Sequence, residues 1–224
     1  LAYRAAKLLF DEFSLPGGLD MHLIKRIPVA AGLAGGSSDA AAVLRGMNRL
    51  YELGISQKGL MERAVTLGAD VPYCVTGGTC LAEGIGERLR KTVPVPECYV
   101  LVAQLPVGVS TKWVYGELEA DKIQVHPDID GMLEAMEQGD LELLGSRMDN
   151  VLQPVTIAGY PIVQRVIEQM EQTDACKVMM SGSGPTVFGL YRTREVCHEA
   201  YKKMQWMPDV TQVFETECQP AYEE

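Results

Sequence analysis

The sequence predicts an α+β fold, and three observations support this class. Segments with helical spacing and short alternating segments are mixed along the 224 residues, without the regular strand–helix alternation of a parallel sheet. Apolar residues make up 47% of the chain, which is enough for two hydrophobic cores. Pro94 and Pro96 form the clearest break in the pattern. We therefore expect two domains, residues 1–95 and 96–224.

The first part of the chain is predicted to be mainly helical. A Pro-Gly-Gly turn follows the first helix, and Ser56 stands where it can cap a later one. A run of small residues, 32–38, separates the alternating segment from the helix after it. Helices are predicted over residues 1–13, 39–53 and 57–67, a strand over 21–29, and an extended or turn-like segment over 71–81.

The second part combines strands with several helices. Its clearest helical spacing is in residues 161–172, where five apolar side chains recur at intervals of one, three and four. Two short apolar runs flank a second glycine-rich loop and suggest a strand pair. Strands are predicted over residues 99–104, 177–180 and 186–191, and helices over 111–119, 128–137, 141–148, 161–172 and 195–204.

Charge and cysteine usage exclude several classes of function. The 30 acidic and 20 basic residues give a formal net charge of −10, which disfavours binding to a nucleic-acid backbone. No run of about 18 uncharged apolar residues occurs, so no membrane span is expected. The six cysteines form no C-x-x-C pair, which favours reduced core thiols in a cytoplasmic protein and no metal site.

The first glycine-rich loop is a candidate phosphate site. Glycines let the backbone approach a ligand closely, and the positive end of the helix that follows attracts an anion. The alternative is a flexible turn in which Ser38 caps that helix. Walker A is excluded because no lysine follows the glycines, and the spacing does not fit the G-x-G-x-x-G pattern. The candidate residues are Gly32, Leu33, Ala34, Gly35, Gly36, Ser37 and Ser38.

Two further segments are candidates for a site. Asp70 lies between a helix end and a Val-Pro pair, where a rigid turn could present a carboxylate as a general base. The alternative is a turn aspartate that accepts hydrogen bonds from nearby backbone amides. The second glycine loop, residues 180–188, contains Gly182 and Ser183, and its alternative is a plain hairpin turn.

Taken together, the three segments resemble the GHMP kinase superfamily. The run Pro28-Val-Ala-Ala-Gly-Leu-Ala-Gly-Gly-Ser-Ser-Asp-Ala40 resembles its phosphate-binding motif. Gly68-Ala-Asp-Val-Pro-Tyr73 resembles its catalytic-aspartate segment, and Gly182-Ser-Gly-Pro-Thr186 its third motif. The resemblance implies a two-lobed fold: an N-terminal lobe like ribosomal protein S5 domain 2, without its first strands, and a ferredoxin-like C-terminal lobe. The doubled glycine and paired serine are similar to those of members that use ATP to phosphorylate the 2-hydroxyl of a cytidyl diphosphate methylerythritol substrate, a step of non-mevalonate isoprenoid synthesis.

The resemblance also implies roles for individual residues. Asp70 would be the general base, and residues 32–38 would bind the phosphates of ATP. Thr111 would approach the transferred phosphate, and Gly182 and Ser183 would contact substrate. Tyr115 would stack on the cytosine ring, the alternative being a core position of an amphipathic helix. Mg²⁺ would be held by phosphates and water without a dedicated protein site. The expected partners are small molecules only, with neither nucleic acid nor membrane, and the protein would be a monomer or homodimer.

The sequence also departs from the superfamily pattern. No Lys-x-Asn-Leu strand is present, neither Lys7 nor Lys25 stands in that context, and we expect the chain to lack its N-terminal portion. Asp39 is expected to point away from phosphate or to reach it only through Mg²⁺. Asn150 begins an Asn-Val-Leu-Gln run where the family has an Asn-Asp-Leu-Glu-like run, so no direct role is assigned to it. Another GHMP kinase, of the homoserine or mevalonate type, and a non-catalytic nucleotide-binding relative are the alternatives.

Overall fold

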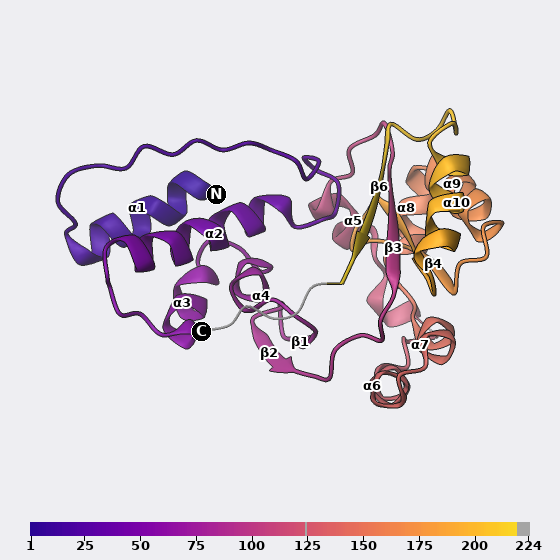
Figure 1. Ribbon diagram of the computed structural model, residues 1–224, viewed down its shortest axis with the longest axis horizontal. Helices are drawn as coiled ribbons and strands as arrows, with labels where there is room; N and C mark the ends of the chain where they lie inside the picture. Colours follow the sequence, from indigo (N-terminus) through magenta and orange to yellow (C-terminus); the bar gives the residue numbers. More distant parts are fainter. Residues whose placement is uncertain (124, 219–224) are drawn as a thin grey trace. The chain divides into compact units, whose positions relative to one another are not determined.

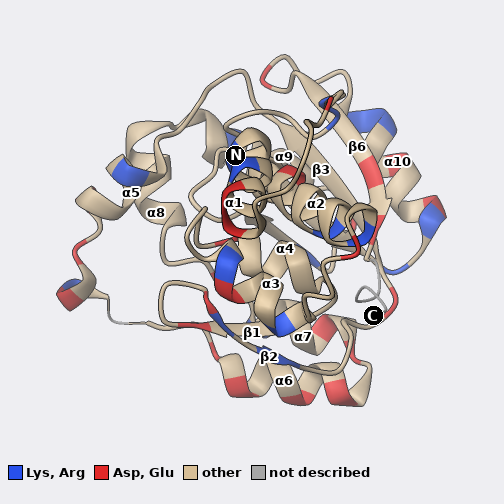
Figure 2. Cartoon of the chain, turned by 90° about the vertical axis from the view of Figure 1, so that its left-hand side faces the viewer, with Lys and Arg blue, Asp and Glu red and all other residues tan. Residues whose placement is uncertain are grey.

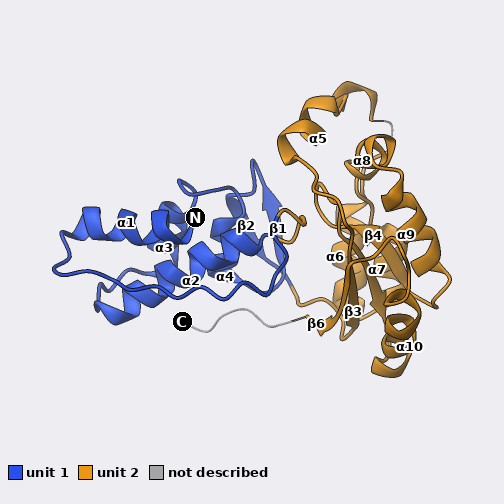
Figure 3. Cartoon of the chain, turned by 90° about the horizontal axis from the view of Figure 1, so that it is seen from above, with its two compact units in different colours: residues 1–29, 34–92, 219–224 blue, residues 30–33, 93–218 orange. Residues whose placement is uncertain are grey.

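The computed structural model describes residues 1–123 and 125–218, and these form two compact units (Figure 3). Unit 1 comprises Leu1–Val29 and Ala34–Thr92, and unit 2 comprises Ala30–Leu33 and Val93–Cys218. The first glycine loop therefore begins in unit 2 and continues into unit 1. The chain passes from unit 1 to unit 2 after Thr92, whereas the domain boundary at 95/96 stays a prediction.

The described residues of unit 1 form four helices and a hairpin (Figure 1). Small side chains let α1 and α2 approach closely, because Ala5, Ala40 and Ala41 are fully buried between larger apolar residues. The two strands of the hairpin pair antiparallel. The elements are α1 (Ala2–Phe13), α2 (Gly35–Leu50), α3 (Gln57–Ala64), α4 (Val71–Thr76), β1 (Cys80–Glu83) and β2 (Arg88–Lys91).

One prediction for unit 1 is wrong, and a second is correct only in part. Residues 21–29 form no strand, and Leu23, Ile24 and Val29 are exposed. A strand needs partners for its backbone groups, and no other strand of the described residues pairs with this segment. Residues 71–76 are helical rather than extended, whereas the end of the predicted segment is extended, since β1 begins at Cys80. The helix tolerates Pro72 because backbone amides in the first turn have no partner within the helix, so the missing N–H of proline costs no hydrogen bond. The three predicted helices are confirmed, with α2 beginning four residues earlier than residue 39 and ending before residue 53.

Unit 2 is built on a four-stranded antiparallel sheet with the order β4-β5-β3-β6. Leu101 and Ala103 point to the face covered by α9 and α10, whereas Val100 points to the other face, towards α6 and α7. The sheet has the ferredoxin-like order expected for the C-terminal lobe. The strands are β3 (Tyr99–Gln104), β4 (Lys177–Met180), β5 (Val187–Tyr191) and β6 (Gln212–Glu217).

The helices of unit 2 match the predicted ones closely, and α8 is the helix that the sequence pattern missed. Figure 1 shows α9 and α10 side by side on one face of the sheet. None of the helices among the described residues has the length and apolar content needed to cross a bilayer. The helices are α5 (Thr111–Glu117), the 3₁₀ turn η1 (Ala120–Lys122), α6 (Ile129–Gln138), α7 (Leu141–Arg147), α8 (Gln153–Gly159), α9 (Ile162–Glu171) and α10 (Arg194–Met204).

Candidate functional site

The phosphate-loop residues of unit 1 form the first turn of α2. Ala34 is the N-cap residue and has a left-handed conformation with φ of 50°. The first backbone hydrogen bond of the helix runs from the Ser38 amide to the Ala34 carbonyl, over 2.9 Å. The amides of Gly35, Gly36 and Ser37 precede this bond, so the helix itself provides them with no acceptor. Such a turn suits an anion. The interpretation of Ser38 as the helix cap is wrong, because the helix begins before it.

A lysine and an aspartate are paired beside this turn. Lys25 forms an ion pair with Asp39, and the two side chains are 31% and 20% exposed. An ideal Cβ on Gly35 would lie 2.8 Å from the Ile27 side chain, so this glycine lets the preceding segment pack against α2. The carboxylate of Asp39 is therefore matched by a cation within unit 1, which reduces the repulsion that phosphate would otherwise meet there.

Gly32 is the residue through which the start of the first loop docks on the second glycine loop. Its φ is +70°, and its carbonyl accepts a hydrogen bond from Ser181 Oγ over 2.9 Å. A Cβ at this position would lie 2.7 Å from the Ser181 carbonyl oxygen and 2.8 Å from that of Gly184. Only glycine fits this contact without a shift of the backbone.

The second glycine loop is a tight turn between β4 and β5. The amide of Ser181 donates to the Thr186 carbonyl and the amide of Gly184 donates to the Ser181 carbonyl, both over 2.8 Å. The hydroxyls of Ser183 and Thr111 lie 2.9 Å apart. Gly32, Thr111, Gly182 and Ser183, all singled out in the sequence, are thus brought together within unit 2.

Three polar residues that sequence reasoning did not assign hold this loop in place. We call Asn150, Gln153 and Thr156 the α8 clamp, because Asn150 lies just before α8, Gln153 begins it and Thr156 lies inside it. Asn150 Nδ2 donates to the carbonyls of Met180 and Gly182, over 2.9 and 2.8 Å. Gln153 Oε1 accepts from the Met180 amide over 2.9 Å, and Thr156 Oγ1 donates to the Ser183 carbonyl over 3.2 Å. Their spacing of three residues was the available signal.

Asp70 stands at the N-cap position of α4 and is exposed to solvent. Its side chain makes no capping hydrogen bond, so the alternative of a carboxylate engaged by neighbouring amides is wrong. The helix that carries it is tied to α2. Arg45 Nη1, on α2, donates to the carbonyls of Cys74 and Val75 over 2.5 and 3.4 Å. The carboxylate is thus held on a braced helix and faces solvent.

Tyr115 lies on α5 and is 60% exposed, so the alternative of a core position is wrong. Val114 is the buried residue of this helix. Trp113 packs edge-to-face on Tyr160, with ring centroids 5.6 Å apart, and this contact anchors the helix. Tyr115 therefore presents an aromatic side chain to solvent, which is the surface that stacking on a base requires.

Residues 1–123 and 125–218 contain no cluster of three or more metal-ligating side chains. The expectation of core thiols is only partly correct: Cys98 and Cys197 are buried, whereas Cys218 is exposed. The sulfur atoms of Cys98 and Cys218 lie 4.0 Å apart. The Cys98 thiol hydrogen-bonds to Cys218 and holds the pKa of Cys218 down, at about 7.

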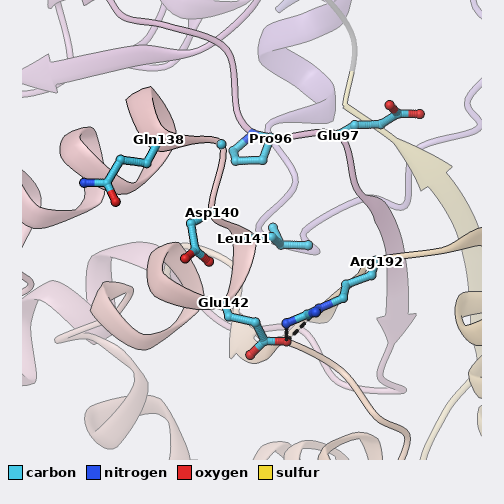
Figure 4. Close-up of a pocket in the computed structure, with 8 residues that line it drawn as sticks. Pro96, Glu97, Gln138, Asp140, Leu141, Glu142 and Arg192 are labelled. Carbon is cyan, nitrogen blue, oxygen red and sulfur yellow. Dashed lines mark hydrogen bonds and ion pairs between the residues drawn. The ribbon is translucent and has the colours of Figure 1, made fainter.

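Charged residues and hollows elsewhere do not add to this site. Figure 2 shows basic residues along β2 and acidic residues along α6, both away from the glycine loops in sequence. Figure 4 shows a hollow of about 530 Å³ in unit 2, where Arg192 forms an ion pair with Glu142 over 2.6 Å. None of the predicted site residues lines this hollow.

Comparison with known families defines the class of protein. The GHMP kinases N terminal domain matches residues 1–78, and the GHMP kinases C terminal domain matches residues 132–205. The three motifs and the two-unit architecture are therefore those of a GHMP kinase.

The individual relatives point to one family within this class. A 4-diphosphocytidyl-2-C-methyl-D-erythritol kinase of Lachnospira eligens is 47% identical over 97% of this chain and 75% of its own length. That of Bacillus subtilis is 46% identical over 93% of this chain and 72% of its own length. A crystal structure of 4-(cytidine 5'-diphospho)-2C-methyl-D-erythritol kinase matches with a TM-score of 0.83 at 32% identity, over 96% of this chain and 76% of that one. The chain belongs to the 4-diphosphocytidyl-2-C-methyl-D-erythritol kinase family.

The homoserine kinase from Cytophaga hutchinsonii gives a TM-score of 0.80, over 98% of this chain and 76% of that one. Its sequence identity of 20% shows the shared fold alone.

Proposed function

We propose that this protein transfers the γ-phosphate of ATP to the 2-hydroxyl of 4-diphosphocytidyl-2-C-methyl-D-erythritol, a step of isoprenoid synthesis. The observation that carries the proposal is the combination of relatives at 46–47% identity with three matching motifs in this chain. The homoserine-type alternative rests on a relative of only 20% identity.

Residue roles follow from the chemistry of phosphoryl transfer, which depends on positioning and on stabilising charge. The α2 turn of Gly35, Gly36, Ser37 and Ser38 would bind phosphate oxygens through its amides and hydroxyls. Leu33, Ala34 and Gly32 would continue this cradle. Asp70, unengaged by capping bonds, would accept the proton of the substrate hydroxyl.

The unit 2 residues would bind the substrate. Thr111 and Ser183, whose hydroxyls are paired, would approach the transferred phosphate, and Gly182 would let the backbone come close to it. Tyr115 would stack on the cytosine ring with its exposed face. These contacts fix which alcohol is presented to ATP.

The metal expected with ATP would be held mainly by the nucleotide. Asp39, a carboxylate close to the cradle in sequence, is paired with Lys25, and the described residues contain no cluster of three metal-ligating groups. Mg²⁺ keeps several waters and binds through phosphate oxygens, so it would need few ligands from the protein. When bound, the ion would neutralise charge on the transferring phosphate.

The test is a substrate comparison with purified protein, ATP and Mg²⁺. We expect phosphate transfer, followed by ³¹P NMR, to 4-diphosphocytidyl-2-C-methyl-D-erythritol and none to homoserine or mevalonate. Transfer to homoserine or mevalonate in place of the cytidyl substrate would refute the proposal. Nucleotide binding without transfer to any of the three would favour the non-catalytic alternative.

A further inference from the structure

Both the nitrogen and the oxygen of the Asn150 side-chain amide form hydrogen bonds with backbone groups. Nδ2 donates to the carbonyls of Met180 and Gly182, and Oδ1 accepts from the Leu152 amide over 3.0 Å. Two carbonyl acceptors require a donor group between them, so the orientation of the amide is fixed by the network. Aspartate has the same shape but, when ionised, has no hydrogen to donate.

The loop held in this way carries contacts to two other parts of the proposed site. Ser181 Oγ donates to the Gly32 carbonyl, and the Ser183 hydroxyl is paired with that of Thr111. Gly182, between them, is the residue whose carbonyl Asn150 holds. A shift of this carbonyl would therefore displace contacts to the phosphate cradle and to α5 together.

The other two members of the α8 clamp act on the flanks of the same loop. Gln153 accepts from the Met180 amide, and Thr156, fully buried, donates to the Ser183 carbonyl. Asn150 alone reaches the carbonyl of a glycine with positive φ, at 55°, where backbone freedom is greatest.

We propose that Asn150 is a positioning residue for phosphoryl transfer: by holding the Gly182 carbonyl it sets the placement of Ser183 and Gly32. This inference rests on the proposed function, because it assigns Asn150 to the same reaction. Asn150 does not itself touch the reacting atoms. Misplacement of a supporting group by about 1 Å can cost on the order of 100-fold in rate.

The decisive variant is Asn150→Asp. At neutral pH its carboxylate would face two carbonyl oxygens, and we expect kcat/KM for the cytidyl substrate to fall by about 100-fold. Placement between two carbonyl oxygens favours the protonated acid, which can donate one of the two lost bonds. The ratio of variant to wild-type kcat/KM should therefore rise as the pH falls from 8 towards 5.5. Asn150→Ala, which cannot regain a bond, should show a ratio that does not change with pH.

Asn48 supplies a matched control. In unit 1 its Nδ2 donates to the Ile55 carbonyl over 2.8 Å and its Oδ1 accepts from the Ile55 amide over 3.0 Å. Asn48→Asp removes a hydrogen bond from a side-chain amide to a backbone carbonyl, as Asn150→Asp does, but at a position outside both glycine-rich loops. We expect its kcat/KM to stay within about twofold of wild type, with no dependence of the ratio on pH.

Hydrogen–deuterium exchange of the peptide covering residues 180–187 gives a readout that needs no activity. Faster exchange in Asn150→Asp but not in Asn48→Asp, together with the pH-dependent loss of kcat/KM, is the expected result. Wild-type exchange, or faster exchange with unchanged kcat/KM, would overturn the positioning role in an active enzyme. Absence of transfer by wild type would refute the proposed function and the turnover part of this inference, while the exchange data would still decide whether Asn150 holds the loop.

Discussion

Replacing Gly32 with alanine tests whether docking of one glycine loop on the other matters for function. The left-handed conformation at φ +70° costs alanine about 1–2 kcal/mol. The new methyl would also meet two backbone oxygens, at 2.7 and 2.8 Å, and neither can rotate away as a side chain can. Overpacking of this kind costs about 1–3 kcal/mol. Keeping the docked geometry would thus cost about 2–5 kcal/mol.

The loop has a less costly response, which is to detach. Detachment gives up the hydrogen bond from Ser181 to the Gly32 carbonyl, worth about 0.5–1.5 kcal/mol. We therefore expect Gly32→Ala to lower the free energy of unfolding by only about 0.5–1.5 kcal/mol. The loss of kcat should be much larger, about 100-fold, because the cradle is no longer fixed.

The assay compares urea unfolding and phosphate transfer in Gly32→Ala and in Gly46→Ala. Gly46 lies inside α2 with nothing within 4 Å of an added Cβ, so alanine should stabilise the helix by about 0.5–1 kcal/mol and leave turnover unchanged. Wild-type kcat in Gly32→Ala, with an unfolding free energy within about 0.5 kcal/mol of wild type, would refute the reasoning.

Four further changes have defined outcomes. Asp70→Asn should lower kcat by about 100-fold or more while the ATP dissociation constant, measured by calorimetry, stays unchanged; near-wild-type turnover would remove Asp70 from the role of base. Tyr115→Ala should raise the KM for the cytidyl substrate about tenfold, as loss of one stacked ring predicts, and leave that for ATP unaltered; an unchanged KM for the cytidyl substrate would exclude stacking. The Thr186 hydroxyl is buried without a hydrogen-bond partner among the described residues, so Thr186→Val should raise the free energy of unfolding by about 1 kcal/mol, and a loss of stability would show that the hydroxyl is satisfied. Arg63 holds the pKa of Glu12 below its usual 4.5, so this pair stabilises the fold above that pH and loses its effect as the pH falls through the lowered pKa. Glu12→Gln should cost at most about 1 kcal/mol at pH 7 and nothing in strong acid, and a deficit that persists in acid would contradict the ion pair as its cause.

The elements with strong local signals were predictable from the sequence. The helix α9 has five apolar residues at helical spacing, and β3 is an apolar run of strand length that lies inside the sheet. Each forms as predicted because the spacing of its apolar residues favours the same structure that buries their side chains. The hairpin turn between β4 and β5 was predictable for a similar reason, because its glycines adopt positive φ.

The elements that were missed depend on contacts distant in sequence. The alternation in residues 21–29 resembles that of a strand, but a strand forms only where another strand accepts its hydrogen bonds. β6 was missed because it is an edge strand in which only Val213 and Phe214 are partly buried. The spacing of Asn150, Gln153 and Thr156 could not by itself show which backbone groups they hold, since the partners of Asn150 lie 30 and 32 residues away.

The hydrogen bonds from Arg45 to α4 have a consequence for how the protein could be altered. They tie the helix that begins with Gly35, Gly36, Ser37 and Ser38 to the helix that begins at Asp70, all within unit 1. The spacing between the proposed phosphate amides and the proposed base is therefore built in during folding. Thr111, Tyr115 and Ser183 belong to unit 2. A designer who seeks a different acceptor alcohol could therefore vary the surroundings of Tyr115 while keeping the spacing between the α2 turn and Asp70, provided that Gly32, Thr111 and Ser183 are left unchanged.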